Sequence, residues 1–400
     1  MKNIVDPDSR MKLLVAERNR KMASSAHAYV RGSTARFYEW LETSDAAVLP
    51  KGPEAWICGD CHIGNLGPVA SADGALAIQI RDLDQTVIGN PAHDIIRLGL
   101  SLAMAARGSD LPGVTTVRML ERLTDGYESA FEPELLGKRP ETEMPNAIGR
   151  VMKEAAKRSW KHLADDRIEG IEPVIPLGKR FWPLTAEERE AVDALFTDPS
   201  VQKLATVLRS RDDDAPVRVL DAAYWQKGCS SLGRLRLAVL VAVGKGKAER
   251  HCLMDVKEAI AAAAPRSPTA SMPRDNAERV VTGARSLSPH LGERMLSARL
   301  LGKSVFIREL LPQDLKLEIE RLTVDEAMSV ADCLAQVVGR AHARQLDASS
   351  RKQWLGELSK NRSKSLDVPS WLWKSVVSLI STHEAAYLEH CRRYSMEEAA

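Results

Sequence analysis

The stretch from residue 217 to residue 311 constrains the fold of this chain most, because its apolar residues recur with a period of two. That period is typical of strands that bury one face. Glycines and lysines at 244–247 predict a tight hairpin turn within the stretch. The sequence predicts five strands and one helix, which lie at 217–225, 232–243, 251–258, 276–287 (the helix), 295–301 and 304–311. We therefore expect a five-stranded antiparallel sheet with one helix inserted after its third strand.

Helical periodicity dominates on both sides of this stretch. Residues 91–107 form an almost wholly apolar run, which indicates a helix that is buried on every side. Thr185 with Glu188, and Thr323 with Glu326, have the spacing of capping boxes ahead of apolar periodic segments. Each pair therefore predicts the start of an amphipathic helix.

Two short strands are expected within the first helical part, at 56–58 and 76–80, with a turn at 72–74 between them. The fold class is therefore α+β. The predicted division is a helical lobe at 1–212, a sheet lobe at 213–320 and closing helices at 321–400 that return to the helical lobe.

The composition is that of an ordinary globular chain and excludes several classes of protein. The 56 basic and 54 acidic residues nearly cancel, so no global field favours nucleic acid or an anionic membrane. The longest strongly apolar run, at 237–243, is far shorter than the ~20 residues of a membrane helix. The first residues are too charged for a secretory signal, and six unevenly spaced cysteines do not suggest a disulfide framework. We expect a cytoplasmic protein without membrane or nucleic-acid partners.

The densest group of polar residues lies at 58–65 and 81–84, at the ends of short strands. Carboxylate and amide oxygens are the ligands that magnesium prefers, and it commonly takes one or two carboxylates together with phosphates. Any single aspartate here is better explained as a turn former. The grouping favours function, and the residues concerned are Asp60, His62, Asn65, Asp82 and Asp84. Asp60 is placed to accept a proton while Asn65 and Asp82 hold a metal ion.

The same segment admits a competing interpretation. Cys58, Cys61 and His62 match the pattern for covalent haem attachment, and two cysteines at this spacing also suggest a redox pair or half of a zinc site. Haem attachment usually needs an exported protein, and tetrahedral zinc needs a second pair of ligands. The other cysteines are scattered singly. We therefore interpret this match as coincidence.

A second constellation lies in the sheet. The segment 228–233 begins and ends with glycine, and such a loop lets backbone amides approach phosphate oxygens, although many tight turns look the same. Lys257 follows apolar Val256 on a later strand. A buried ammonium is costly without a partner, so Lys257 should meet a phosphate or a carboxylate. Glu278 on the following helix is one candidate carboxylate, and a surface residue is the alternative.

These patterns together resemble the protein-kinase-like superfamily. Asp60 and Asn65 have the spacing of its catalytic aspartate and metal-binding asparagine, and Asp82 with Asp84 resembles its metal-binding segment. A histidine two residues after the aspartate is similar to small-molecule kinases of the aminoglycoside and choline kinase type. Asp94, after Gly89 and Pro91, resembles an aspartate that braces the catalytic loop.

The resemblance implies ATP and Mg²⁺ as cofactors and assigns a role to each candidate residue. Asp60 would be the catalytic base or would orient the acceptor hydroxyl, and His62 would orient the loop or touch substrate. Asn65 and Asp82 would bind magnesium. Asp84 would hold a second metal ion or support Asp82. ATP would be bound by the glycine loop, the strand lysine paired with a helix glutamate, and a hinge at 306–312; the residues concerned are Gly228, Ser230, Ser231, Gly233, Lys257, Glu278, Glu309 and Leu310.

The order of these parts differs from that of an ordinary kinase, because the catalytic loop precedes the sheet lobe. The helix that ends at 339–344 resembles the one that normally runs straight into the catalytic loop. Joining it to the segment at residue 58 would restore the usual order. The resemblance therefore implies a two-lobed kinase-like fold in circularly permuted order.

The whole chain is also similar to a bacterial family known as domain of unknown function 2252. The matching stretches are 28–33, 59–67, 82–84, 228–233, 256–259, 279–281 and 340–344. Cys58 and Leu83 depart from the kinase pattern, which has histidine and phenylalanine there. Arg31 lies in the first matching stretch, and both a surface role and substrate contact stay open for it.

The function implied is transfer of the γ-phosphoryl group of ATP to a hydroxyl of an unknown, small-molecule acceptor. Two alternatives stay open. The same residues would serve a nucleotidyl transferase that transfers AMP, and a nucleotide-binding pseudokinase would act as a sensor or scaffold. A pseudokinase usually lacks a base or a metal ligand, and here none is missing from the pattern.

Overall fold

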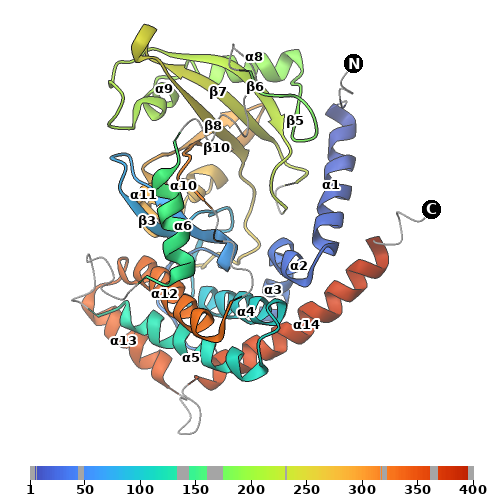
Figure 1. Ribbon diagram of the computed structural model, residues 1–400, viewed down its shortest axis with the longest axis vertical. Helices are drawn as coiled ribbons and strands as arrows, with labels where there is room; N and C mark the ends of the chain where they lie inside the picture. The colour runs from blue at the N-terminus through green and yellow to red at the C-terminus, as the bar shows by residue number, and fades with distance from the viewer. Residues whose placement is uncertain are drawn as a thin grey trace.

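The computed structural model of the chain describes residues 5, 7–43, 49–132, 144–159, 174–229, 232–315, 317, 322–360 and 368–394. It is an α+β fold with one large antiparallel sheet at one end and a group of helices at the other (Figure 1). The predicted fold class is confirmed at this level.

The large sheet contains six strands in the described part of the chain. Every neighbouring pair is antiparallel, and the order across the sheet is β5 (Phe181–Trp182), β6 (Val217–Trp225), β7 (Arg236–Val243), β8 (Arg250–Glu258), β10 (Lys303–Leu310) and β9 (Met295–Leu300). All five predicted strands are present, although β7 begins at Arg236 rather than at residue 232. The sixth strand, β5, has two residues and is too short to show an alternating pattern. The predicted helix is α10 (Asn276–Leu287), and α11 (Pro289–Gly292) follows it.

The two faces of the sheet have different partners. Leu237, Val239 and Val241 of β7 pack on one face with α8 (Ala186–Leu195) and α9 (Pro199–Thr206). Leu14 of α1 (Pro7–Ala23) joins that core, and β5 pairs with β6 at the edge of the sheet. The division predicted at residue 212 stays a prediction, and segments on both sides of it pack on this face.

The opposite face of the sheet mixes apolar and charged side chains. Ala238 and Leu240 of β7 and Leu253 of β8 form a small apolar cluster there. Side chains alternate along a strand, so Asp255 and Lys257 share this face with Leu253. This face is turned toward the helical part of the molecule (Figure 1).

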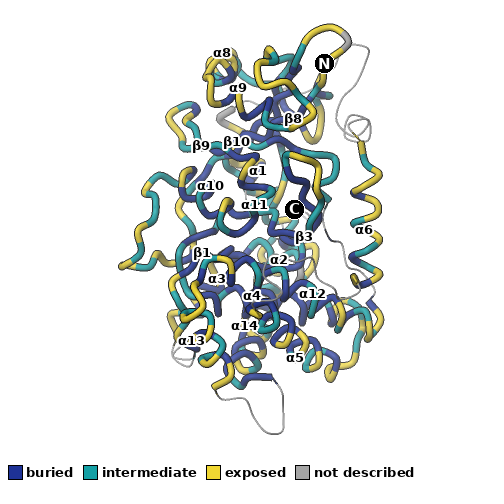
Figure 2. The backbone as a smooth tube through the Cα atoms, turned by 90° about the vertical axis from the view of Figure 1, so that its left-hand side faces the viewer, coloured by how far each residue is buried: buried dark blue, intermediate teal, exposed yellow. Residues whose placement is uncertain are grey.

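The helical part is built around α4 (Ala92–Gly108), the predicted apolar helix, which is buried along most of its length. Around it pack α5 (Gly113–Ser129), α12 (Val324–Ala343) and α14 (Ser370–Tyr394). Both predicted capping boxes are present, at the starts of α8 and α12. The remaining described helices are α2 (Ala26–Gly32), α3 (Thr34–Leu41), α6 (Asn146–Lys157) and α13 (Ala348–Ser359). Figure 2 shows α6 as a largely exposed helix beside the buried body.

Two small two-stranded sheets between the large sheet and the helices carry the polar segments. The strand β1 (Ala55–Ile57) pairs with β4 (Val87–Gly89), and β2 (Leu66–Ala70) pairs with β3 (Leu76–Ile80). The predicted turn at 72–74 therefore joins β3 to β2, not to the strand at 56–58, because Gly67 and Pro68 hide β2 in the sequence. Since β1 leads to β2 and β3 leads to β4, the connections at 58–65 and 81–86 lie side by side.

The first helix, α1, and the last, α14, contact each other along the side of the molecule (Figure 1). His390 of α14 lies 2.8 Å from the carbonyl oxygen of Asn19, and Tyr387 donates to the carbonyl oxygen of Ala23 at 3.2 Å. None of the helices in the described ranges is both long and apolar enough to cross a membrane.

Candidate functional site

The segment 58–65, which we call the Asp60 loop, is held by side chains that bond to its backbone, among them those of Asp94 and Tyr38. The Asp94 carboxylate, in the first turn of α4, accepts the amide hydrogens of Cys58 at 2.7 Å and Gly59 at 3.0 Å. The Tyr38 hydroxyl donates to the carbonyl oxygen of Gly59 at 2.7 Å. Gly59 has φ +73°, and a Cβ there would lie 2.2 Å from the carbonyl oxygen of Gln85. Only glycine fits this position, where the two polar connections touch.

Asp60 is buried and its carboxylate is oriented by Arg97 of α4, which forms a charged hydrogen bond to Oδ1. Oδ2 lies 3.9 Å from Nε2 of His62. The side-chain amide of Asn65 donates to the carbonyl oxygen of Asp60 at 2.9 Å. Burial raises the pKa of Asp60, and the Arg97 charge works against that rise. The structure thus brings the three predicted residues of this loop together.

Arg97 was not among the predicted site residues, although the sequence contains a signal for it. It is a charged residue in the apolar middle of α4, and it is 1% exposed. A buried cation at such a position needs a carboxylate partner.

Asp82 and Asp84, in the connection between β3 and β4, meet Lys257 of the large sheet. The ammonium of Lys257 contacts Oδ2 of Asp84 and lies 3.6 Å from Oδ1 of Asp82. Lys257 is 2% exposed, whereas the side chain of Asp82 is 42% exposed. Residues far apart in the chain therefore form one charged cluster, with Asp82 at its open side.

The two aspartates differ in their electrostatics. Burial alone would raise the pKa of Asp82, but the charges of Lys257 and Arg308 hold it well below its usual range. Burial and the neighbouring charge of Asp82 raise the pKa of Asp84 against the pull of Lys257. Asp82 is therefore the firmly ionised member of the pair.

Glu278 lies outside this cluster. It is exposed on α10, and within the ranges that the structure describes no ion pair joins it to Lys257. Its neighbour Arg279 faces inward and donates to the carbonyl oxygens of Asp84 at 3.0 Å and Ile260 at 2.8 Å. The predicted pairing of Lys257 with Glu278 is therefore replaced by the aspartates, and α10 reaches the site through Arg279, because the apolar stripe of α10 turns that residue inward.

A second buried ion network shares the sheet face of Lys257. Asp255 accepts two hydrogen bonds from Arg236, at 2.8 and 2.6 Å, and two from Arg308, both at 3.3 Å. Arg308 also donates to the carbonyl oxygen of Arg81 at 2.9 Å, directly before Asp82. This network ties the sheet to the acidic segment. This network was not predicted, although the strand period places its residues on one face.

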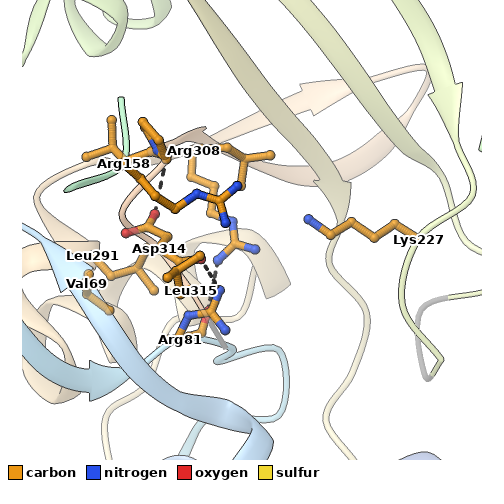
Figure 3. A pocket seen from close by; sticks show the side chains of 11 residues that line it. Val69, Arg81, Arg158, Lys227, Leu291, Arg308, Asp314 and Leu315 are labelled. Atoms are coloured by element: carbon orange, nitrogen blue, oxygen red, sulfur yellow. Dashed lines mark hydrogen bonds between the residues drawn. The ribbon is translucent and has the colours of Figure 1, made fainter. Parts of the chain in front are cut away.

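A pocket of about 140 Å³ opens at the end of β10, where the hinge was predicted (Figure 3). Figure 3 shows Arg81, Arg158 and Arg308 close together with Lys227 facing them across the pocket. The apolar part of the lining consists of Val69, Leu291, Leu310, Leu311, Pro312 and Leu315, and Asp314 completes it. The pocket therefore has an apolar side and a cationic side.

The two predicted hinge residues differ in position. Leu310 lines the pocket. The carboxylate of Glu309 points elsewhere and binds Arg211 through two hydrogen bonds of 2.7 Å. The carbonyl oxygen of Glu309 accepts from Arg294 at 3.0 Å. Glu309 therefore supports the end of β10 and does not line the pocket.

The glycine loop packs against the N-terminal helix. Gly228 and Gly233 have φ +94° and +93°, which glycine adopts readily. Ser230 and Ser231 lie outside the described residues. The ammonium of Lys21 donates to the carbonyl oxygen of Gly228 at 3.4 Å. The loop that was predicted to cover a nucleotide thus lies beside α1.

The oxygen atoms around Asp82 fit a hard cation. Asp84 Oδ1 is buried and accepts no hydrogen bond, and the side-chain nitrogen of Asn65 is engaged by Asp60, which leaves its amide oxygen available. The amide hydrogen of Arg81 bonds to the carbonyl oxygen of Asn65 at 2.7 Å, which keeps Asn65 beside this segment. In the described part of the chain, no group of three or more His, Cys, Asp or Glu residues is arranged to hold a metal ion. Two carboxylates and an amide suit magnesium, which completes its shell with phosphate and water.

Cys58 and Cys61 are free thiols. A hydrogen bond with Cys61 and burial raise the pKa of Cys58 well above its usual range. Redox-active thiols have a lowered pKa, so the electrostatics here oppose a redox pair.

Comparison with known proteins gives one match. The family model described as an uncharacterized protein conserved in bacteria (DUF2252) matches residues 10–393. No curated protein and no solved structure matches the chain.

Proposed function

The chain belongs to this uncharacterized bacterial family, and we propose from its own geometry that it is an ATP- and magnesium-dependent phosphotransferase of kinase-like fold. The observation that carries the proposal is the contact of Lys257 with Asp82 and Asp84, beside the Asp60 loop. Lys257 lies on β8, the third of the five long strands. In protein kinases a lysine on the third strand and a metal-binding aspartate hold the phosphates of ATP.

The pocket at the end of β10 supports a nucleotide ligand. Its apolar side, with Leu310 and Leu311, suits a purine base, and its cationic side suits phosphates. Arg308 lines the pocket and bonds to the backbone directly before Asp82, so the cationic side adjoins the proposed metal ligands.

Contacts between α12 and β1 support a permuted kinase order. His342, near the end of α12, lies 3.1 Å from the Asp94 carboxylate that holds the Asp60 loop. Gln345 bonds to both the amide hydrogen and the carbonyl oxygen of Trp56, at 2.7 and 3.0 Å. The end of this helix thus lies where β1 begins, although the two are 289 residues apart in sequence. A direct connection at this point would give the usual kinase order.

The proposed reaction assigns one task to each side chain. An acceptor hydroxyl attacks the γ-phosphorus and passes its proton to Asp60, while the bond from that phosphorus to the bridging oxygen of ADP breaks. Arg97 keeps Asp60 oriented. Magnesium held by Asn65, Asp82 and Asp84 would supply charge neutralisation for the phosphates. Lys257 would bind phosphate oxygens in exchange for part of its contact with the aspartates.

The test is a thermal-shift titration of the full chain with ATP, with and without magnesium. Magnesium-dependent stabilisation at millimolar ATP is expected, and its absence would refute the proposal. Asp60→Asn should abolish transfer of a labelled γ-phosphoryl group while leaving ATP affinity nearly unchanged, whereas Lys257→Met should weaken ATP binding. Asp193→Asn, in an exposed residue of α8, is the control. The mass added to the acceptor separates phosphoryl transfer from AMP transfer.

A further inference from the structure

Arg31, at the end of α2, lies against the Asp60 loop. A Cβ built on Gly64 would be 3.2 Å from Cζ of Arg31 and 3.3 Å from Cε1 of His62. The guanidinium group therefore lies over Gly64 and next to the His62 ring. Gly64 has no side chain that would prevent this approach, and Asp60 is on the same loop.

The charge of Arg31 is not neutralised by the described residues around it. Its Nε is buried and forms no hydrogen bond, and in those parts of the chain no carboxylate lies within ion-pair distance of its guanidinium. Arg97 and Arg236, in contrast, each bind an aspartate. A partly buried guanidinium without an anion is costly, so this side chain is available for a ligand.

Further positive charge surrounds the same space. Lys21 donates to the carbonyl oxygen of Gly228, and a Cβ on Gly32 would lie 3.2 Å from Sγ of Cys229. Burial raises the pKa of the Cys229 thiol, and the charges of Arg31, Lys21 and Arg18 oppose that rise. Three cations therefore act on the Cys229 thiol, and one of them, Lys21, has Glu17 at 3.6 Å.

We propose that Arg31 binds an anionic group, a phosphate or a carboxylate, that the acceptor substrate carries beside its reacting hydroxyl. This inference rests on the proposed phosphotransferase function and adds the chemical class of the acceptor. The cations next to the metal ligands, Lys257 and Arg308, belong to the sheet and serve the nucleotide. Arg31 comes from the other side and reaches the loop that carries the base. Its planar fork matches either oxyanion with two parallel hydrogen bonds.

The test uses the full chain with magnesium and a saturating non-hydrolysable ATP analogue, so that the nucleotide site is filled. Inorganic phosphate and acetate are titrated separately at constant low ionic strength, and binding is followed by calorimetry. Saturable binding of one of the two anions is expected, and the anion that binds identifies the group. Arg31→Gln should weaken that binding by about tenfold or more, because charged hydrogen bonds are lost. Arg31→Lys should retain part of it.

Arg36→Gln is the matched control, because Arg36 is an exposed arginine on α3 that pairs with Glu39. Equal anion affinity in wild type and Arg31→Gln would overturn the inference, as would the absence of saturable binding of either anion at tens of millimolar. ATP affinity is measured alone in each variant. A parallel loss of ATP affinity in Arg31→Gln would assign Arg31 to the nucleotide and overturn the inference. Arg31-dependent phosphate binding by a chain that binds no ATP would uphold the anion site while refuting the phosphotransferase function.

Discussion

Lys257 is the only cation that contacts Asp84 through an ion pair in the described residues, and both side chains are largely buried. Replacing Lys257 by Met leaves Asp82 and Asp84 as neighbouring carboxylates without that cation. Removing one partner of a buried pair commonly costs about 3–5 kcal/mol. We expect the free energy of unfolding in urea to fall by about 3 kcal/mol, because Asp82 is partly open to water. Adding Asp84→Asn should recover a large part of the loss.

Lys303→Met is the control for this double-mutant cycle, since Lys303 is half exposed and pairs with Glu258 at 2.8 Å. An exposed pair of this kind contributes about 0–1 kcal/mol. If Asp84→Asn destabilised the Lys257→Met variant further, the two charges would not stabilise each other in the folded chain, and the prediction would be wrong.

Gly59 gives a second prediction at the residue scale. An alanine there must adopt φ +73° and would also place its Cβ 2.2 Å from the carbonyl oxygen of Gln85. Gly74 has φ +86° but nothing within 4 Å of a Cβ. Gly74→Ala should therefore cost about 1 kcal/mol of unfolding free energy, for backbone strain alone. Gly59→Ala should cost about 3 kcal/mol or more, because the two polar connections must move apart. Similar losses for the two variants in urea unfolding would contradict the close approach.

At the level of elements, the sequence predicted the existence and type of most segments. Strand alternation and capping boxes gave the five long strands and the starts of α8 and α12, because these signals depend on local residues alone. The strand β5 and the pairing of β2 with β3 were not predicted. A two-residue strand has no period, and hydrogen-bond partners are chosen by tertiary structure.

The candidate site was predictable only where residue type and local spacing decide the chemistry. Asp60, Asn65, Asp82, Asp84 and Lys257 do lie in two adjoining clusters. Glu278 was a candidate partner because it follows Lys257 on a helix, but the rotation of α10 about its axis places Arg279 inward instead. Such a rotation depends on which apolar residues of the helix meet the rest of the core, so one sequence does not determine it.

Four helices are joined by one chain of buried hydrogen bonds. Trp354 of α13 donates to the hydroxyl of Tyr127 in α5 at 3.1 Å, and that hydroxyl lies 2.9 Å from Nδ1 of His342 in α12. Nε2 of His342 lies 3.1 Å from the carboxylate of Asp94 in α4, which holds the Asp60 loop. Tyr127→Phe would leave buried groups of both Trp354 and His342 without partners. We expect a loss of about 2–4 kcal/mol of unfolding free energy.

The control for Tyr127→Phe is Tyr387→Phe, which removes one half-buried hydrogen bond to the carbonyl oxygen of Ala23. That change should cost only about 0.5–1.5 kcal/mol. Equal losses in thermal or urea unfolding would show that the bonds of Tyr127 act singly and not as a chain.

At the scale of the whole molecule, the first helix connects the sheet part with the helical part. Arg10 of α1 binds Glu188 at 2.7 Å on the sheet side, while Asn19 and Ala23 of the same helix contact α14. The proposed site lies between those two parts, with Lys257 on one and the Asp60 loop on the other. The relative position of the sheet part and the helical part therefore determines whether the site residues meet. A substitution that loosens the contact between these two parts should change both the global stability and the geometry of the site.

The pH dependence of global stability gives a test of packing at α14. His383 is 1% exposed, and burial together with the charge of nearby Arg97 lowers its pKa to about 4. In the unfolded chain a histidine titrates near ~6.5. Between those values the unfolded state binds more protons than the folded state, so stability falls as the pH drops. From pH 7 to pH 5 this histidine should remove about 2 kcal/mol of unfolding free energy.

His383→Leu should remove that contribution. The test compares how steeply the unfolding free energy falls with pH in wild type and in the variant, and this comparison is independent of any change in absolute stability. Urea unfolding of wild type and His383→Leu at pH 7, 6 and 5 should therefore show the smaller decline in the variant. Thr382→Ala, in an exposed residue of α14 without a titratable group, is the control and should keep the wild-type slope. If His383→Leu instead lost stability as steeply as wild type, His383 would have to take up its proton in the folded chain. The side chain of His383 between α14 and Arg97 would then be open to water, which would contradict its burial.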